Sequence, residues 1–396
     1  MIYERLGVPT IVNAKGTATR LSGGIMRPEV VEAMAEASQH CIDMMELQAK
    51  ASTIIADHTG AEAGLVTSGA AAGLLLGTAA AVTGIDPGRM NRLPDTAGMP
   101  NEVVVVRSQR NLYDHALRTV GVRLIEVGLP DRYAGAGVRD AEAWEIADAI
   151  NERTAAILWV ADPAARPLLA EVTAVGKANE IPVIVDAAAQ LPPVSNLHRF
   201  IDEGADLVAF SGGKALGGPQ ASGILAGRQE LIMAAALQML DMDILFDQWQ
   251  PPAAFIDKAR LKGLPQHGIG RPCKAGKEEI AGLLTALESF VAEDPVARRN
   301  HWLDRCREIV AATGALDDAE LELRDDGEIP TVALTLDEGR ASMSAFQLLL
   351  ALENGEPSIR PDNAALHRAQ LIFNPQCLEP DGPGKIGLRL RELLRP

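Results

Sequence analysis

The chain has few of the features that mark secreted, membrane-spanning or metal-binding proteins. Its four cysteines are widely separated and form neither a CxxC pair nor a cysteine–histidine spacing typical of zinc. No apolar run reaches the roughly 18 residues of a membrane span, and the first residues lack the basic and apolar regions of a secretory signal. We therefore expect a cytoplasmic protein with reduced thiols, no metal site and no membrane partner.

Basic residues are too scattered for a nucleic-acid partner. The formal net charge is −16, and the longest basic run is the pair Arg298 and Arg299. Because phosphate backbones repel such a surface, we expect a small-molecule substrate and no bound nucleic acid. The 396 residues exceed what a single hydrophobic core usually supports, so one large and one smaller domain are expected.

Short apolar segments alternate with helical patterns through the middle of the chain. Helices are predicted at 70–82, 140–151 and 172–179. The alternation indicates an α/β fold with a mostly parallel, doubly wound sheet, in which ligands gather at the carboxyl ends of the strands. The predicted strands are 103–106, 123–127, 155–160, 182–186 and 207–211.

A break at Gln250-Pro251-Pro252 suggests the domain boundary. We predict an N-terminal segment (1–50) that packs with the small domain, a large α/β domain (51–250) and a small α+β domain (251–396). The small domain contains helical patterns at 277–293 and 301–313 and strand-like stretches at 331–336 and 385–390. Residues 84–101 are predicted to form a surface loop.

Lys214 lies in the segment FSGGKALGGPQ, which spans residues 210–220 and follows an apolar strand. A lysine at a strand end is partly removed from water, and burial lowers the pKa of its amine and makes it a usable nucleophile. We therefore predict that Lys214 forms the Schiff base with pyridoxal 5'-phosphate (PLP).

Asp186 ends a predicted strand 28 residues before Lys214. A carboxylate in this place suits the protonated pyridine nitrogen of PLP, although an aspartate here also suits a helix N-cap. Ala188, two residues further on, would point to the same face and lie under the ring, or simply pack.

Three short segments are candidates for the rest of the cofactor site. Ser68-Gly69-Ala70 opens an alanine-rich helix whose N–H groups suit a phosphate, although Ser68 also suits an ordinary N-cap. Ser211 would add a hydroxyl, and Gly218 would allow close backbone approach. His115 follows the strand 103–106, where a side chain stacked on the ring is expected, and Tyr113 competes for that role.

Four arginines are candidates for the substrate carboxylate, because a planar guanidinium binds a carboxylate through two hydrogen bonds. Arg118 lies close to His115, and Arg107 flanks the same region. Arg271 and Arg360 lie in probable loops of the C-terminal half, where solvated arginines are the alternative interpretation.

Four segments together resemble a known family. They are VNAKG (12–16), TGAEA (59–63), the lysine segment (210–220) and GRPCKAGKEE (270–279). The chain resembles the selenocysteine synthase (SelA)-like family of fold-type-I PLP enzymes, and most closely its D-glucosaminate-6-phosphate ammonia-lyase-like members. The resemblance implies PLP on Lys214, Asp186 as the pyridine partner and an active site at a subunit interface in a homodimer or larger homo-oligomer.

One departure from the family bears on function. Selenocysteine synthases carry a tRNA-binding domain before the first motif, which starts here at about residue 13, so we do not expect tRNA-dependent chemistry. We predict a lyase that removes the α-proton of a hydroxy amino acid or sugar amino acid, eliminates its β-group and releases ammonia. A PLP-dependent racemase, epimerase or aminotransferase and a non-catalytic α/β binding protein remain the alternatives.

Overall fold

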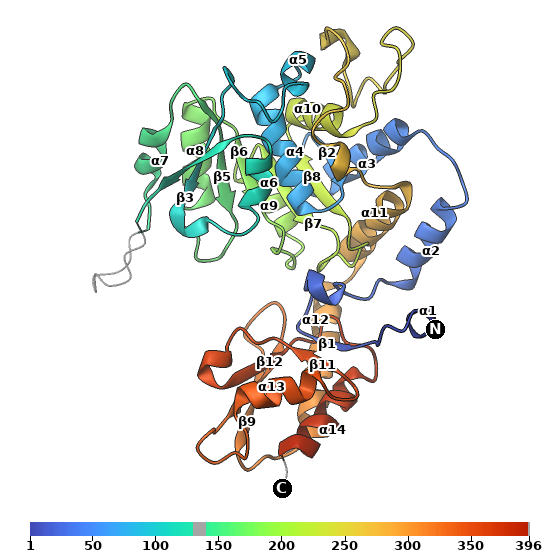
Figure 1. Ribbon diagram of the computed structural model, residues 1–396, viewed down its shortest axis with the longest axis vertical. Coiled ribbons are helices and arrows are strands. Elements are labelled where there is room, and N and C mark those ends of the chain that lie inside the picture. Colours follow the sequence, from blue (N-terminus) through green and yellow to red (C-terminus); the bar gives the residue numbers. More distant parts are fainter. Residues whose placement is uncertain (130–139, 395–396) are drawn as a thin grey trace. The chain divides into compact units, whose positions relative to one another are not determined.

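The computed structural model describes residues 1–129 and 140–394. Contacts divide the chain into a larger unit, Met26–Val291, and a smaller unit made of Met1–Ile25 and Ala292–Pro396 (Figure 1). In the described ranges, no helix combines the length and the apolar character that crossing a membrane requires.

The larger unit is built on a seven-stranded sheet with the order β2-β8-β7-β6-β5-β3-β4. Only β8 runs antiparallel to its neighbours, so the mostly parallel sheet predicted from the sequence is confirmed. The strands are β2 (Ala63–Thr67), β3 (Glu102–Val106), β4 (Arg123–Val127), β5 (Thr154–Val160), β6 (Val183–Asp186), β7 (Leu207–Ser211) and β8 (Gly223–Gly227).

Helices cover both faces of this sheet (Figure 1). Successive side chains of a strand point to opposite faces, so Val103 and Val105 enter one core while Val104 and Val106 enter the other. The first core is closed by α4 (Ala70–Thr83), α6 (Asp114–Thr119) and α10 (Gln229–Met239). The second is closed by α3 (Met44–Thr59), α7 (Ala143–Ala149), α8 (Leu169–Ala178), α9 (Asn196–Asp202) and α11 (Lys277–Ala292).

Helix α4 carries no charged residue, and its sequence, AAAGLLLGTAAAVT, is apolar or small all round. Such a helix is stable only when it is covered on more than one side. The sheet covers one side of α4, and α10 covers another. The amino end of α4 is therefore held firmly at the edge of the sheet where β2 ends.

The direction of the strands brings the candidate site residues to one edge. Thr67, Val106, Asp186 and Ser211 are the last residues of β2, β3, β6 and β7, which all run the same way. The antiparallel strand β8 begins at this edge, where Gly223 pairs with both Thr67 and Ser211. Ligands of open α/β sheets bind at such an edge.

Residues 84–101 differ from the predicted surface loop. They contain the short helix α5 (Pro87–Met90), which Asp86 caps by accepting hydrogen bonds from two backbone N–H groups. Met90 and Met99 are almost fully buried in the first core. The prolines predict a loop, but the segment that contains them is held in place by the two buried methionine side chains.

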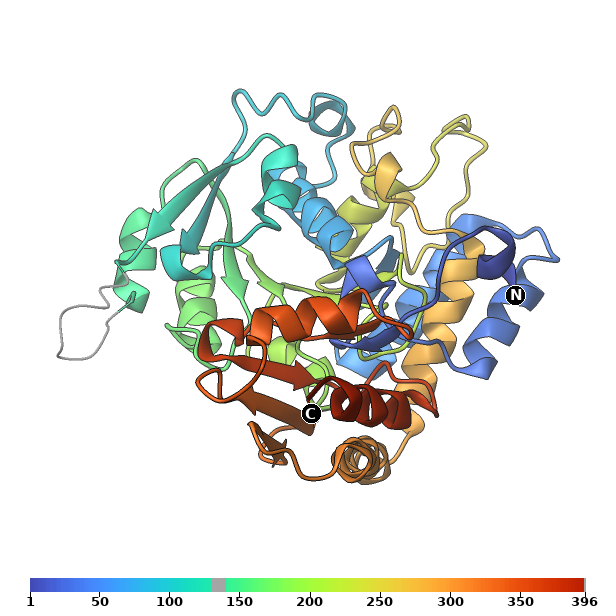
Figure 2. The same ribbon diagram turned by 60° about the horizontal axis from the view of Figure 1, so that its bottom comes forward.

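The smaller unit contains a three-stranded antiparallel sheet with the order β12-β10-β9 and a parallel pair, β1 and β11. Helices α12 and α13 contact these strands, and α14 packs against α12 (Figure 2). The elements are α1 (Ile2–Arg5), β1 (Val12–Ala14), α12 (Pro295–Thr313), β9 (Ala319–Arg324), β10 (Thr331–Leu336), α13 (Ala345–Glu353), β11 (Ile359–Pro361), β12 (Gln370–Phe373) and α14 (Gly382–Leu394).

The strand predicted at 385–390 is wrong, because these residues belong to α14. Ile386 and Leu390 are buried, whereas Leu388 is exposed, and this pattern follows one face of a helix. Gly387 allows close packing on α12, since a Cβ there would lie 2.7 Å from the backbone nitrogen of Thr313. The composition of this short apolar run suits a strand and a helix equally well. Packing against α12 stabilises the helix.

The observed boundary between the units differs from the predicted one at residue 250. Residues 26–50 and 251–291 belong to the larger unit. Phe255 and Ile256 are buried in its first core, and α11 buries Ile280 and Leu283 in its second. Strand β1 pairs with β11, which explains why the chain's first residues belong to the smaller unit.

Candidate active site

Lys214 lies in a tight turn that directly follows β7. The N–H of Gly217 donates to the carbonyl of Lys214, and the N–H of Gly218 donates to the carbonyl of Gly212, both at 2.9 Å. A Cβ on Gly213 would lie 2.5 Å from the Cα of Gln220, so the two halves of the turn are in direct backbone contact. The turn thus holds the lysine at the strand edge with little freedom of its main chain.

Asp186 and Lys214 interact electrostatically at this edge. Burial lowers the pKa of the Lys214 amine, and the Asp186 carboxylate opposes this shift. Burial likewise raises the pKa of Asp186, which is 8% exposed. The N–H of Ala188, which donates to the carboxylate at 3.1 Å, and the charge of Lys214 both oppose this rise. Asp186 is thus a buried carboxylate suited to a cationic partner, and Lys214 is a partly buried amine whose pKa is lowered.

The turn between β2 and α4 forms a cradle for an anion. Gly69 is the N-cap of α4 with φ of 142°, and no side chain caps this helix. The alternative interpretation of Ser68 as an ordinary N-cap is therefore wrong, because Gly69 holds the N-cap position. The N–H of Ser68 donates to the carbonyl of Cys273. Because the first N–H groups of a helix have no partner within it, those of Gly69, Ala70 and Ala71 are placed to bind a phosphate.

Gly223, at the start of β8, packs directly against this cradle. A Cβ at this position would lie 2.6 Å from the nitrogen of Ala70 and 2.8 Å from the Cα of Gly69. Sequence reasoning missed Gly223, because nothing in the local pattern shows that a strand 150 residues away touches the helix start. Because Gly223 has no side chain, β8 packs directly against the backbone of the cradle.

Replacing Gly223 by alanine is expected to weaken PLP binding by about tenfold or more, because the new methyl group displaces the backbone that would bind the phosphate. Titration of the cofactor-free protein with PLP, followed by its absorbance, measures this change. Gly263→Ala is the matched control, since a Cβ there meets nothing within 4 Å. Unchanged PLP affinity in the folded Gly223→Ala protein would contradict the assignment of the cradle.

A pocket of about 380 Å³ joins the cradle to the region of His115. Ser68 and Gly69 line it together with Tyr113, His115 and Cys273. Nδ1 of His115 lies 3.2 Å from Nη2 of Arg118, which brings a guanidinium beside the imidazole. The structure therefore brings together the predicted phosphate cradle, both candidates for the ring contact and Arg118.

Cys273 contributes its carbonyl oxygen to the site. Its carbonyl accepts the N–H of Ser68 at 3.2 Å, and burial raises the pKa of its thiol, so the thiol stays protonated at neutral pH. Within the described residues, no group of three or more His, Cys, Asp or Glu is arranged to hold a metal ion.

The remaining three arginines are held by acidic partners within their own units. Arg107 forms an ion pair of 3.1 Å with Glu126. Arg271 donates to the carbonyl of Met239 at 2.8 Å and to Asp241 at 3.0 Å. Arg360 belongs to the smaller unit, where it forms an ion pair of 3.1 Å with Glu353. Neither is the freely solvated arginine of the alternative interpretation, and both keep further N–H donors for a ligand.

Comparison with known proteins agrees with this geometry. A family model described as L-seryl-tRNA selenium transferase matches residues 112–247. A 5'-C-glycyluridine monooxygenase-decarboxylase from a Streptomyces species is 32% identical over 100% of this chain and 92% of its own length. D-glucosaminate-6-phosphate ammonia lyase from Salmonella typhimurium is 30% identical over 99% of this chain and 97% of its own.

A solved structure of D-glucosaminate-6-phosphate ammonia-lyase matches with a TM-score of 0.82 at 28% identity, covering 100% of this chain and 98% of the other. The architecture is that of the fold-type-I PLP enzymes, with the aminotransferase-like sheet described above. The chain belongs to the SelA-like family, with D-glucosaminate-6-phosphate ammonia lyases among its near relatives. The family resemblance predicted from the sequence is thus confirmed, and its members are PLP-dependent enzymes.

Proposed function

We propose that this protein is a PLP-dependent ammonia-lyase that acts on a hydroxy amino acid or sugar amino acid. One observation carries the proposal: Lys214, Asp186 and the uncapped start of α4 meet at one sheet edge. The full-length similarity to D-glucosaminate-6-phosphate ammonia lyase supports the same reaction class.

The residues of this edge fit the cofactor. Asp186 would pair with the pyridine nitrogen, and the N–H groups of Gly69 and Ala70 would bind the phosphate. Lys214 would hold the aldehyde carbon as a Schiff base. Further contacts to the ring and the phosphate are proposed for Ser68, Ser211, Gly218, Ala188 and His115. When bound, PLP supplies an electron sink for the charge that develops on the substrate's α-carbon.

The chain's own residues move the protons. With the substrate amine in place of Lys214, the freed Nζ would accept the proton as the Cα–H bond breaks. The Cβ–O bond then breaks, and the oxygen leaves as water after taking up a proton. The remaining enamine reacts with water to give a 2-oxo acid and ammonia, so the reaction needs no oxidant.

Arginines would orient the substrate by its carboxylate. Arg271 is the strongest candidate in the larger unit, because Met239 and Asp241 already fix its guanidinium and leave other donors available. Arg118, beside His115, and Arg360 are proposed for the same role. An ordered guanidinium loses less freedom on binding and aligns the Cα–H bond better.

The similarity to the Streptomyces enzyme suggests a second candidate reaction. The Streptomyces enzyme that matches along the whole chain is a monooxygenase-decarboxylase, which implies consumption of dioxygen and loss of the substrate carboxylate. The same lysine and aspartate would serve that reaction. Racemisation and transamination also begin with loss of the α-proton and stay as further alternatives.

The proposal is tested with the PLP-loaded protein and a panel of D- and L-hydroxy amino acids and sugar amino acids, phosphorylated and not. Ammonia and 2-oxo acid should form in equal amounts, without an amino acceptor and without dioxygen uptake. Dioxygen uptake with carbon dioxide release would favour the second reaction. Inversion at Cα without ammonia would indicate a racemase, and a wild-type protein that never takes up PLP would refute all of these.

We also propose that the protein acts in the cytoplasm as a homodimer or larger homo-oligomer. The cysteines Cys41, Cys273, Cys306 and Cys377 are all free, which is consistent with a reducing compartment. Exposed apolar side chains such as Leu245, at 74%, are consistent with a contact between copies.

A further inference from the structure

One buried amide lies in an otherwise apolar stretch of α10. Residues 231–239 of this helix are all buried, and Gln238, at 0% exposed, is the polar side chain among them. Burying an amide costs free energy unless it is hydrogen-bonded, whereas a leucine or methionine would fill the same space without that cost. The hydrogen-bond partners of Gln238 therefore indicate what the amide does.

The side chain of Gln238 joins two distant parts of the larger unit. Its Nε2 donates to Oγ1 of Thr83, at the end of α4, and its Oε1 accepts the N–H of Ile269, both at 3.3 Å. Its backbone carbonyl accepts the N–H of Gly270 at 3.1 Å. A Cβ on Gly268 would lie 2.6 Å from the Cα of Gln238, so the segment around Ile269 lies directly on the end of α10.

Arg271 is the next residue of this segment. Its Nη1 donates to the carbonyl of Met239, the residue after Gln238, at 2.8 Å. Two residues further along the segment, the carbonyl of Cys273 accepts the N–H of Ser68 in the phosphate cradle at 3.2 Å. Gln238 therefore holds a segment that carries a candidate substrate arginine and also contacts the cofactor cradle.

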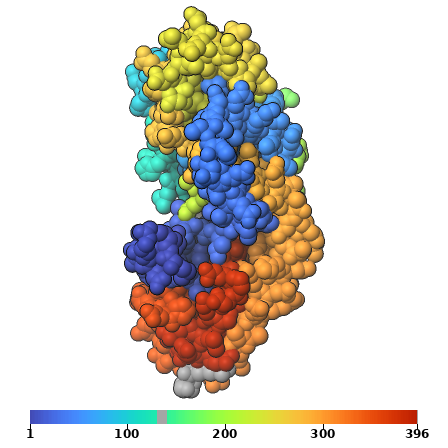
Figure 3. Space-filling view, turned by 90° about the vertical axis from the view of Figure 1, so that its right-hand side faces the viewer, coloured from blue at the N-terminus to red at the C-terminus, as the bar shows by residue number. Residues whose placement is uncertain are grey.

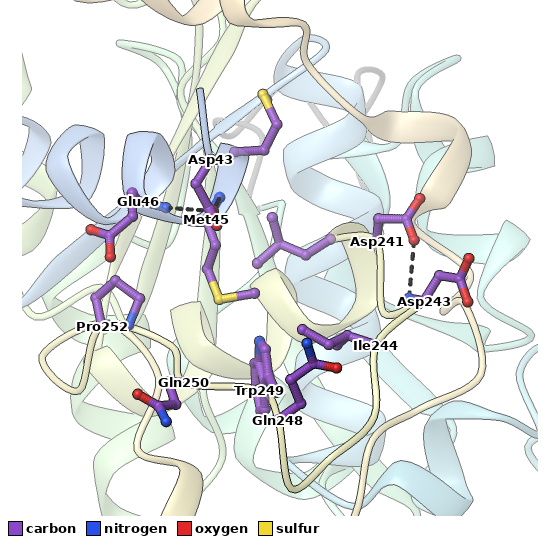
Figure 4. Close-up of a pocket in the computed structure, with 12 residues that line it drawn as sticks. Asp43, Met45, Glu46, Asp241, Asp243, Ile244, Gln248, Trp249, Gln250 and Pro252 are labelled. Carbon is purple, nitrogen blue, oxygen red and sulfur yellow. Dashed lines mark hydrogen bonds between the residues drawn. The ribbon is translucent and has the colours of Figure 1, made fainter. Parts of the chain in front are cut away.

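The other partner of Arg271, Asp241, holds it less firmly. The side chain of Asp241 is 59% exposed, and ion pairs of exposed groups are weakened by solvent. Asp241 borders an open cavity of about 610 Å³, where its Oδ1 accepts the N–H of Asp243 at 3.1 Å (Figure 4). Figure 3 shows the yellow segment that follows α10 at the surface, beside the blue segment with α2 (Pro28–Ala37) and α3. The buried contacts at the end of α10 therefore contribute most to the position of Arg271.

We propose that Gln238 is a positioning residue for recognition of the substrate carboxylate. It fixes the backbone that carries Arg271, so the guanidinium meets a carboxylate with little further loss of conformational freedom. This role rests on the proposed function in one respect, because it takes Arg271 as the group that binds the carboxylate. It does not depend on which bond of the bound amino acid breaks.

Two amines that differ in one group measure carboxylate recognition by the PLP-loaded protein. Alanine, used as each enantiomer, has the amine and the carboxylate but no β-hydroxyl to eliminate. Isopropylamine carries a methyl group in place of the carboxylate. The change in the absorbance of bound PLP gives the affinity for each amine. We expect the wild type to bind at least one enantiomer of alanine about tenfold or more tightly than isopropylamine.

Gln238→Met removes both side-chain hydrogen bonds and keeps the length of the side chain. It should weaken alanine binding by about five- to tenfold and change isopropylamine binding by less than about twofold. Thr83→Val removes only the acceptor of the amide and should weaken alanine binding by about two- to threefold, which provides a test if Gln238→Met does not fold.

Gln229→Met is the matched control from the start of the same helix. The Gln229 side chain donates to the carbonyl of Phe255 at 2.9 Å, so this substitution also removes a hydrogen bond of a glutamine in α10. Neither amine should bind differently to it.

A double variant shows whether Gln238 acts through the arginine. Arg271→Lys should remove most of the preference for alanine. Adding Gln238→Met to it should change alanine binding by less than about twofold, because both substitutions remove the same interaction.

Three results would overturn the proposal. The first is a wild type that binds isopropylamine as tightly as alanine. The second is a Gln238→Met protein in which both amines bind equally more weakly, or neither does. The third is a double variant in which the free-energy effects of the two substitutions add. Ammonia release is measured separately, so a failure of the proposed reaction and a failure of the role of Gln238 are told apart.

Discussion

Lys214→Ala is expected to release ammonia at least about 10³-fold more slowly than the wild type. The variant loses the amine that we propose both to hold the cofactor and to take the α-proton. Burial lowers the pKa of this amine, which makes it easier to deprotonate than a solvent-exposed lysine. Steady-state ammonia release measures the loss, and borohydride reduction followed by mass spectrometry measures the missing covalent link.

Lys274→Ala is the matched control for this prediction, because Lys274 is an exposed lysine in one of the family motifs. It should keep its covalent cofactor and most of its activity. Added methylamine should restore part of the activity of Lys214→Ala, since a small amine enters the space of the side chain and accepts the proton. A Lys214→Ala protein with more than a tenth of wild-type activity would refute the role of Lys214.

Asp186→Asn is expected to lower the rate of ammonia release by about 10²- to 10⁴-fold. Asparagine keeps the size of the side chain and an acceptor for the N–H of Ala188, but it lacks the charge that would hold a proton on the pyridine nitrogen. Asp206→Asn is the control. Asp206 accepts the N–H of Val183 at the opposite end of β6 and pairs with Arg228, so its loss should reduce stability and not turnover.

In the cofactor-free protein, Asp186→Asn is expected to increase the stability of the fold. Burial raises the pKa of Asp186, so the folded state binds a proton there more tightly than the unfolded chain does. The ionised carboxylate therefore opposes folding, and this effect develops as the pH rises from the unfolded pKa through the folded pKa. Cofactor-free Asp186→Asn should melt at a higher temperature than wild type at neutral pH, with a smaller difference in acid. A lower melting temperature at neutral pH would contradict this.

The sequence alone predicts the central part of the site because that part depends on local pattern. An apolar strand followed by glycines around Lys214, and a second strand ending in Asp186, place both residues at the carboxyl edge of a parallel sheet. Strand direction then brings them together without further information. The helix at Ala70 is predicted for the same reason, since small residues open it directly after a strand.

The parts that the sequence does not predict depend on contacts between distant segments. The support from Gly223, the carbonyl of Cys273 and the partners of Arg271 each require two segments that only folding brings together. The apolar pattern at 385–390 predicts a strand, and it forms part of the helix α14 because its buried face packs on α12. The cavity that Asp241 borders likewise joins residues 43–46 to residues 240–252, which share no pattern.

The antiparallel strand β8 has a consequence for how the cofactor enters. Gly212 donates its N–H to the carbonyl of Ser222, and Ser211 pairs with Gly223, so both ends of the lysine turn are fixed where β7 ends and β8 begins. The conformational entropy of this turn is therefore lost when the protein folds, before any ligand arrives. Its amide hydrogens should exchange equally slowly with and without PLP, and cofactor capture becomes a docking event onto a preorganised surface.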